Sequence, residues 1–279
     1  MSETATVTRP DDVTYSDYLK LPELLALQVP LADGVDDELL FITVHQVQEL
    51  WFGQLLRDLT DARDRMLEGD PRAARVRLVR AVSVTRALIA AIHPLRAMPP
   101  REFHAFRGVL GSSSGQQSAQ YVEIAALCGA DWVHGEYGRR TVAGLAPRER
   151  ERLRGRLAES TLWEGFVALL AKAGFAVGTR EERWEAYARL AAGPLDGDPA
   201  EFAELAELAE ALVDHDEVWT EWRACHALLV ERQIGGRPGT GGSSGMAHLR
   251  ASVYRRFYPE LWEARDAGFP ELPARCPMG

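Results

Sequence analysis

The chain has 279 residues, a formal net charge of −9 and 46% hydrophobic residues. An acidic chain without a basic stripe argues against a nucleic-acid surface. The sequence contains no uninterrupted run of about 18 apolar residues, so it predicts no membrane span. Its first residues lack the basic and apolar regions of a signal peptide. The three cysteines form no CxxC pair, which fits a reducing compartment. We therefore expect a cytoplasmic protein that binds neither nucleic acid nor membrane.

Helical periodicity dominates the chain from residue 36 onward. Apolar residues spaced by three and four predict a long helix over 36–67. Asp70-Pro71 begins a second helix, which Pro94 ends near residue 93. The further expected elements are a short helix around 103–107, helices over 117–127, 147–158, 161–173, 180–192, 199–234 and 247–265, and an irregular stretch over 130–146.

The sequence predicts no β-sheet, because Val, Ile and Thr never gather in alternating runs. We therefore expect an all-α fold, a single helical-bundle domain over 1–279. Residues 1–14 are expected to be a flexible N-terminus. The helices over 147–192 could form a small helical subdomain.

Two histidines lie on apolar faces of different long helices. His226 shares a stripe with Trp219 and Trp222, and His45 follows Phe41 by one helical turn. Spacing alone favours a core histidine bonded to the backbone in each case. Two such histidines together indicate a shared site, because helical bundles build cofactor pockets from facing side chains. One imidazole could bind haem iron while the other faces the open coordination side.

Two polar segments could complete such a pocket. Arg107 follows an apolar turn, and a guanidinium there could hold a carboxylate bidentately, although spacing alone favours a surface arginine. The segment 235–245 contains six glycines together with Thr240, and its backbone could approach a small ligand closely. This loop lacks the lysine of a phosphate-binding loop and no strand precedes it, so a nucleotide site is disfavoured.

Several stretches carry a family resemblance when they are read together. They are YSDYL (15–19), FITVHQVQELWF (41–52), FRGVLGSSSGQQSAQY (106–121), the block from Trp222 through GTGGSSG (239–245), and FYPELW (257–262). In this order they resemble the tryptophan 2,3-dioxygenase family. The resemblance implies an all-α, tetrameric enzyme that depends on non-covalently bound haem b. Such enzymes insert both atoms of O2 across the indole C2–C3 bond of L-tryptophan and give N-formylkynurenine.

The resemblance also implies roles for individual residues. His226 matches the axial ligand of the haem iron, His45 matches the distal histidine that contacts the indole N–H, and Phe41 matches the ring that packs on the substrate. The remaining matches bind the amino-acid end of the substrate or come from a neighbouring subunit: Arg107 as the carboxylate clamp, Thr240 near the ammonium and carboxylate, Ser114 in the same pocket, and Tyr15, Tyr18 and Leu19 on an N-terminal segment that reaches into the neighbour's site.

Two positions depart from the family pattern. Phe103 stands where a tyrosine hydroxyl usually contacts the substrate carboxylate, and His248 stands where a tyrosine is common. Loss of one hydroxyl contact would cost roughly 0.5–1.5 kcal/mol of binding. Phe103 leaves open an alternative, a superfamily monooxygenase that acts on a substituted tryptophan and gives a hydroxylated or oxindole product. A third hypothesis is a non-enzymatic haem sensor, which would need His226 but not Arg107, Thr240 and Ser114.

Overall fold

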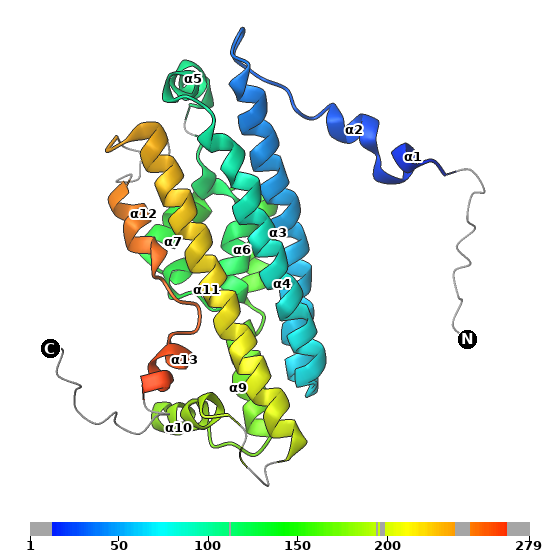
Figure 1. Cartoon of the computed structure of the whole chain (residues 1–279), viewed down its shortest axis with the longest axis vertical. Coiled ribbons are helices and arrows are strands. Elements are labelled where there is room, and N and C mark those ends of the chain that lie inside the picture. The colour runs from blue at the N-terminus through cyan, green and yellow to red at the C-terminus, as the bar shows by residue number, and fades with distance from the viewer. Residues whose placement is uncertain (1–12, 112, 194, 196–198, 238–245, 267–279) are drawn as a thin grey trace, which may run out of the picture.

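The computed structural model describes residues 13–111, 113–193, 195, 199–237 and 246–266. Helices connected by short turns make up the fold (Figure 1), and no strand occurs in these ranges, which confirms the predicted all-α class. The α-helices are α1 (Tyr15–Leu19), α2 (Leu21–Leu25), α3 (Asp37–Glu68), α4 (Pro71–Ile92), α5 (Pro100–Phe106), α6 (Ala119–Leu127), α7 (Glu136–Ala143), α8 (Pro147–Leu157), α9 (Leu162–Lys172), α10 (Arg180–Ala191), α11 (Ala200–Ile234), α12 (Met246–Val253) and α13 (Pro259–Glu263).

Helices α3, α4 and α11 form the centre of the bundle and run alongside one another (Figure 1). The turn between α3 and α4 follows from its sequence. Gly69 ends α3 with φ at 97°, a left-handed conformation that favours glycine, and the Asp70 side chain accepts a hydrogen bond from the Ala73 amide at 2.8 Å. The two helices therefore fold back on each other and bury Leu59 and Leu78 completely.

One segment, 71–96, is long and apolar enough by composition to cross a membrane. It consists of α4 and the short 3₁₀ helix η1 (His93–Arg96). In the structure α4 packs between α3 and α11, and Ala81 and Leu88 are fully buried there. A helix that packs against neighbours on several sides is apolar around much of its circumference, so burial in the bundle explains the apolar composition of α4.

Helices α8, α9 and α10 make up the segment 147–192, for which the sequence left open a small helical subdomain. Helix α9 packs against α3, α8 against α6, and α10 against α11 and α13. Phe166 of α9 and Tyr187 of α10 belong to the same buried cluster as Leu59 of α3. These three helices therefore extend the core of the long bundle.

Two expected elements differ from the structure. The stretch over 130–146 is not irregular, because it contains the 3₁₀ helix η4 (Asp131–His134) and α7. A Cβ atom on Gly138 would lie 2.1 Å from the Val133 carbonyl oxygen, so glycine lets α7 close onto η4. The single helix expected over 247–265 is two helices, α12 and α13. Pro259 begins α13, and the residue before a proline is disfavoured in helical conformation.

Candidate functional site

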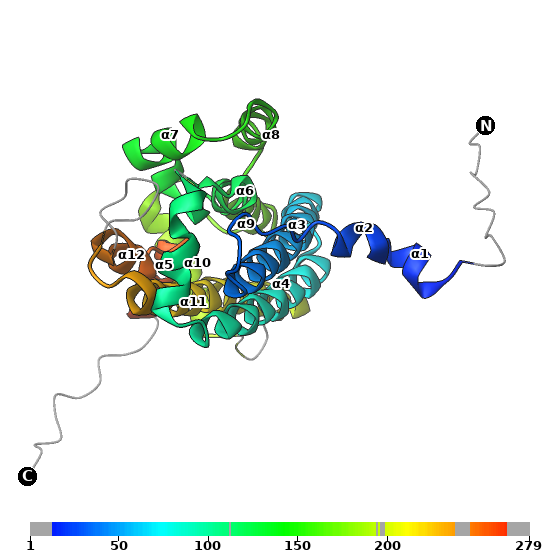
Figure 2. The same cartoon turned by 90° about the horizontal axis from the view of Figure 1, so that it is seen from above.

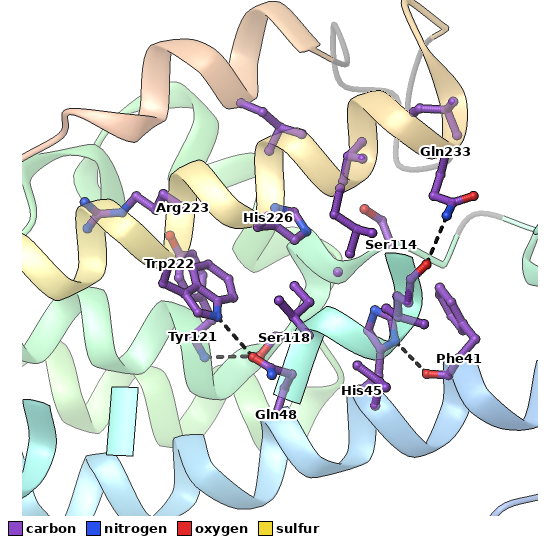
Figure 3. Close-up of a pocket in the computed structure, with 18 of the residues that line it drawn as sticks. Phe41, His45, Gln48, Ser114, Ser118, Tyr121, Trp222, Arg223, His226 and Gln233 are labelled. Atoms are coloured by element: carbon purple, nitrogen blue, oxygen red, sulfur yellow. Dashed lines mark hydrogen bonds between the residues drawn. The ribbon is translucent and has the colours of Figure 1, made fainter. Parts of the chain in front are cut away.

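A cavity of about 300 Å³ lies between α3 and α11 (Figure 3), and residues of α5, α6, α7 and α12 also line it. Its walls at one end are apolar and include Ile92 and Met98. The other end is more polar and includes Tyr137 and Arg255. His45, His226, Phe41, Phe103, Arg107 and Ser114 all line this one cavity.

His45 enters the cavity from α3, with Phe41 one turn before it. Its Nδ1 lies 2.7 Å from the Phe41 carbonyl oxygen, and the two rings are 4.1 Å apart between centroids. Burial lowers the pKa of His45, although the Phe41 carbonyl and Glu49 raise it in part. The imidazole is therefore neutral at neutral pH. Because a carbonyl can only accept, Nδ1 carries the hydrogen and Nε2 keeps a lone pair to receive a donor.

His226 enters the cavity from α11, opposite His45 (Figure 3). Burial and, to a smaller extent, the nearby His45 together lower its pKa to about 4. Some surface of the ring is accessible although the residue lies deep in the fold, because the ring borders the cavity. A neutral imidazole at a cavity wall is competent to bind a transition metal.

Trp222 lies one turn before His226 on the same helix. The two rings are nearly parallel, with 3° between their planes and 5.4 Å between their centroids. The indole Nε1 donates a hydrogen bond to Gln48 Oε1 at 3.1 Å, and Gln48 Nε2 donates to the Leu88 carbonyl at 2.9 Å. One buried glutamine at the cavity wall therefore links α3, α4 and α11.

The apolar end of the cavity brings together Phe103 and Arg107. They lie on successive turns, Phe103 in α5 and Arg107 at the start of the 3₁₀ helix η2 (Arg107–Leu110). Phe103 packs 5.8 Å from Phe41 and 5.4 Å from Phe106 between ring centroids. A guanidinium and the rings of Phe41 and Phe103, which line the same cavity, suit a ligand with one flat apolar part and one carboxylate.

Ser114 lies on the segment that follows η2, and its backbone N–H donates to Gln117 Oε1 at 3.3 Å. Thr240, the remaining predicted contact to the amino-acid end, lies outside the described residues.

The N-terminal residues do not line this cavity in their own chain. Helices α1 and α2 project away from the bundle (Figures 1 and 2), and Tyr15 and Tyr18 are 76% and 78% exposed. Leu19 is also exposed. These residues form an apolar segment without a partner surface in the described part of this chain.

His248 lines the polar end of the cavity from α12. Its ring packs on Tyr137 with 4.3 Å between centroids. Burial lowers the pKa of His248, and the positive charges of Arg255 and Arg140 lower it further. The position that departs from the family pattern thus presents a neutral imidazole rather than a hydroxyl.

Sequence reasoning missed Gln48 and Tyr137. Gln48 comes three residues after His45, on the core-facing side of α3, and is only 6% exposed. A polar residue on a core face usually has a hydrogen-bond partner, and this was the signal that could have identified it. Tyr137 lies in the stretch that was expected to be irregular, and no pattern indicated that it would reach the cavity.

The donor set fits a haem better than a bare metal ion. Within the described residues no group of three or more His, Cys, Asp or Glu side chains gathers to hold a metal. The site instead offers one neutral imidazole, His226, on an otherwise largely apolar wall, and a second imidazole, His45, across the cavity. One axial histidine with a polar residue on the opposite side is a common way to hold haem iron.

The comparisons with known proteins identify the family of the chain. The family model described as Tryptophan 2,3-dioxygenase matches residues 2–173 and 194–267. The chain is 43% identical to a tryptophan 2,3-dioxygenase of Nocardioides sp., over 91% of this chain and 94% of the relative. It is 38% identical to the one of Herpetosiphon aurantiacus and 37% identical to one of Anaeromyxobacter dehalogenans, which cover 91% of this chain and 97% and 96% of the relatives. The chain belongs to the tryptophan 2,3-dioxygenase family.

Proposed function

We propose that this protein is a haem-dependent dioxygenase that inserts both atoms of O2 across the indole C2–C3 bond of L-tryptophan and releases N-formylkynurenine. The observation that carries the proposal is the pair of neutral histidines, His45 and His226, that face one cavity from different helices beside Arg107. Haem b, bound without a covalent link, would supply the iron that binds and activates O2. The family to which the chain belongs supports the same reaction.

His226 is the proposed axial ligand. Iron requires an imidazole that carries a lone pair, and burial keeps His226 in its neutral form well below neutral pH because it lowers the pKa of the ring. Protons therefore do not compete with the metal for this side chain under ordinary conditions.

His45 is the proposed partner of the substrate ring. Its Nδ1–H is committed to the Phe41 carbonyl, so Nε2 is free to accept a hydrogen bond from the indole N–H. Phe41 supplies an aromatic face against which the indole can pack. His45 thereby orients the indole, and orientation toward the oxygen-binding side accounts for much of its contribution to the rate.

Arg107 is the proposed clamp for the substrate carboxylate, because a guanidinium matches a carboxylate with two parallel hydrogen bonds. Phe103 and Ser114 complete this end of the pocket, and Thr240 is proposed to contact the ammonium and carboxylate. An amino acid held at one end and an indole held at the other leave the substrate little freedom, so the reacting bond is fixed in place.

The protein is proposed to act as a homotetramer in the cytoplasm. Exposed Tyr15, Tyr18 and Leu19 on the projecting N-terminal segment support an oligomer in which this segment completes a neighbour's site, since exposed apolar patches commonly mark interaction surfaces. The buried free thiols of Cys128 and Cys225 are compatible with a reducing compartment.

Haem binding by a single-residue variant tests the proposal. His226→Ala should lose the intense haem absorption band on gel filtration of the haem-loaded protein, because the axial ligand is gone. His134→Ala is the matched control, since this histidine is exposed and does not line the cavity. Full haem retention and full activity in the His226 variant would refute the assignment.

A further inference from the structure

The orientation of His226 has an unusual source. Metal-binding histidines commonly donate their second ring N–H to a carbonyl or carboxylate, which fixes the plane of the ring. No hydrogen bond from the His226 ring to another described residue exists. The aromatic contact it makes within the described chain is the nearly parallel stack on Trp222. The plane of the imidazole is therefore set by the plane of the indole.

The orientation of Trp222 is in turn fixed by one polar contact. The indole packs among Phe52, Tyr121 and Trp219, with ring centroids 5.5–6.1 Å away. Ring contacts of this kind prefer certain tilts but leave more than one rotation of an indole possible. The hydrogen bond from Nε1 to Gln48 Oε1 is directional, because an indole has only this one donor. It selects one rotation of the ring.

Gln48 is held firmly enough to serve as the reference point. The side chain is almost fully buried, and its Nε2 is occupied by the Leu88 carbonyl of α4. A carbonyl can only accept, so the amide group must present its oxygen toward the indole. Gln48 lies on α3 three residues after His45 and 174 residues before Trp222 (Figure 3).

We infer that Gln48 is a positioning residue for the iron-binding imidazole, and that it acts through Trp222. The hydrogen bond transmits the position of α3, which carries His45, to the ring of His226 on α11. One amide group thus fixes the orientation of the His226 ring relative to His45 on the opposite side of the cavity. The inference rests on the proposed haem ligation by His226 and adds to it the group that sets the ring plane.

The test follows the bond between iron and imidazole rather than turnover. The iron–imidazole stretching band is recorded by resonance Raman spectroscopy on the ferrous, haem-loaded protein, together with the rate of haem transfer to apomyoglobin. Gln48→Leu should shift and broaden the band and speed haem loss roughly fivefold, the size expected for one lost hydrogen bond. Burial favours the protonated carboxyl in Gln48→Glu, which keeps an acceptor for the indole and an O–H donor for the Leu88 carbonyl, so this variant should restore a band close to that of the unmodified protein.

Gln233→Leu is the matched control. Gln233 is likewise buried and also borders the cavity, from α11, but its Nε2 donates to the carbonyls of Leu95 and Met98, and no hydrogen bond between the described residues joins it to Trp222. This variant should lose stability while its iron–imidazole band stays in place. In a Trp222→Phe background, where the indole N–H is absent, Gln48→Leu should cause no further shift.

Three results would overturn the inference. A band that is unmoved in Gln48→Leu would assign Gln48 a purely structural role. Equal effects of Gln48→Leu with and without the Trp222→Phe substitution would show that it does not act through the indole. An unmodified protein that binds haem without any iron–imidazole band would refute ligation by His226 itself, and this failure is distinguishable because it precedes any substitution.

Discussion

The exchange of Phe103 for tyrosine tests how the pocket holds the amino-acid end of its substrate. Phe103 lines the cavity one turn before Arg107, and its ring is only partly buried, whereas its neighbour Phe106 is fully buried. A hydroxyl added at the tip of Phe103 can therefore extend along the cavity without displacing the core. We expect it to donate a hydrogen bond to the substrate carboxylate beside Arg107.

The expected gain can be worked out from this geometry. A typical hydrogen bond contributes roughly 0.5–1.5 kcal/mol and one to a charged group roughly 1.5–3 kcal/mol, and the partial exposure of residue 103 places the gain at about 1.5 kcal/mol, where the two ranges meet. About 1.4 kcal/mol corresponds to a tenfold change in a dissociation constant. Phe103→Tyr should therefore bind L-tryptophan about tenfold more tightly than the unmodified protein.

Equilibrium titration of the haem-loaded protein with L-tryptophan, followed by the change in the haem absorption spectrum, measures this gain. Tryptamine is the matched control ligand, because it has the indole and the amine but no carboxylate. Its affinity should be unchanged by Phe103→Tyr. Equal tightening of both ligands, or no tightening of either, would refute the placement of the carboxylate between residues 103 and 107.

Three further predictions concern the pocket and the core. Arg107→Ala should raise the KM for L-tryptophan on the order of a hundredfold and leave the affinity for indole nearly unchanged, since only the amino acid carries the carboxylate; steady-state kinetics and an indole titration check this, and equal losses would argue against the clamp. The haem-free protein should lose stability as the pH falls from about 6.5 to 4. Burial gives His215 and His226 folded-state pKa values of about 3 and about 4, below the unfolded value of 6.5. The unfolded chain therefore binds more protons in this window, and each histidine lowers the free energy of unfolding by up to about 1.4 kcal/mol per pH unit as the pH falls. Urea unfolding at pH 7, 5.5 and 4 measures this free energy, and a constant value would contradict the prediction. Gly138→Ala should destabilise the fold by several kcal/mol, because its Cβ would overlap the Val133 carbonyl; a melting temperature equal to that of Gly155→Ala, whose Cβ meets open space, would disprove the close contact.

The long helices were predictable because their signals are local. The apolar spacing of α3, the Asp70-Pro71 start of α4 and the Pro94 stop all act within a few residues, and the structure places each of them close to the expected positions. The segment 130–146 was mispredicted as irregular because its glycines resemble loop residues. Gly138 is small so that α7 can approach η4, which is a tertiary requirement that no local pattern reveals.

The candidate site was predictable only in part for the same reason. His45 and His226 could be identified as core-facing from helical spacing, but spacing alone could not place them across one cavity. The contact between Gln48 and Trp222 joins residues 174 positions apart, and nothing in either helix indicates the other. Helices α1 and α2 were not predicted, because five-residue helices are too short to show a repeat, and the resemblance identified only Tyr15, Tyr18 and Leu19 as part of an N-terminal segment.

The proposed reaction is tested most directly by the fate of molecular oxygen. The reduced, haem-loaded protein is supplied with L-tryptophan under ¹⁸O2, and the product is analysed by mass spectrometry. Dioxygenation predicts N-formylkynurenine that carries two ¹⁸O atoms. A product with one heavy oxygen atom, or no product from L-tryptophan at all, would contradict the proposed function.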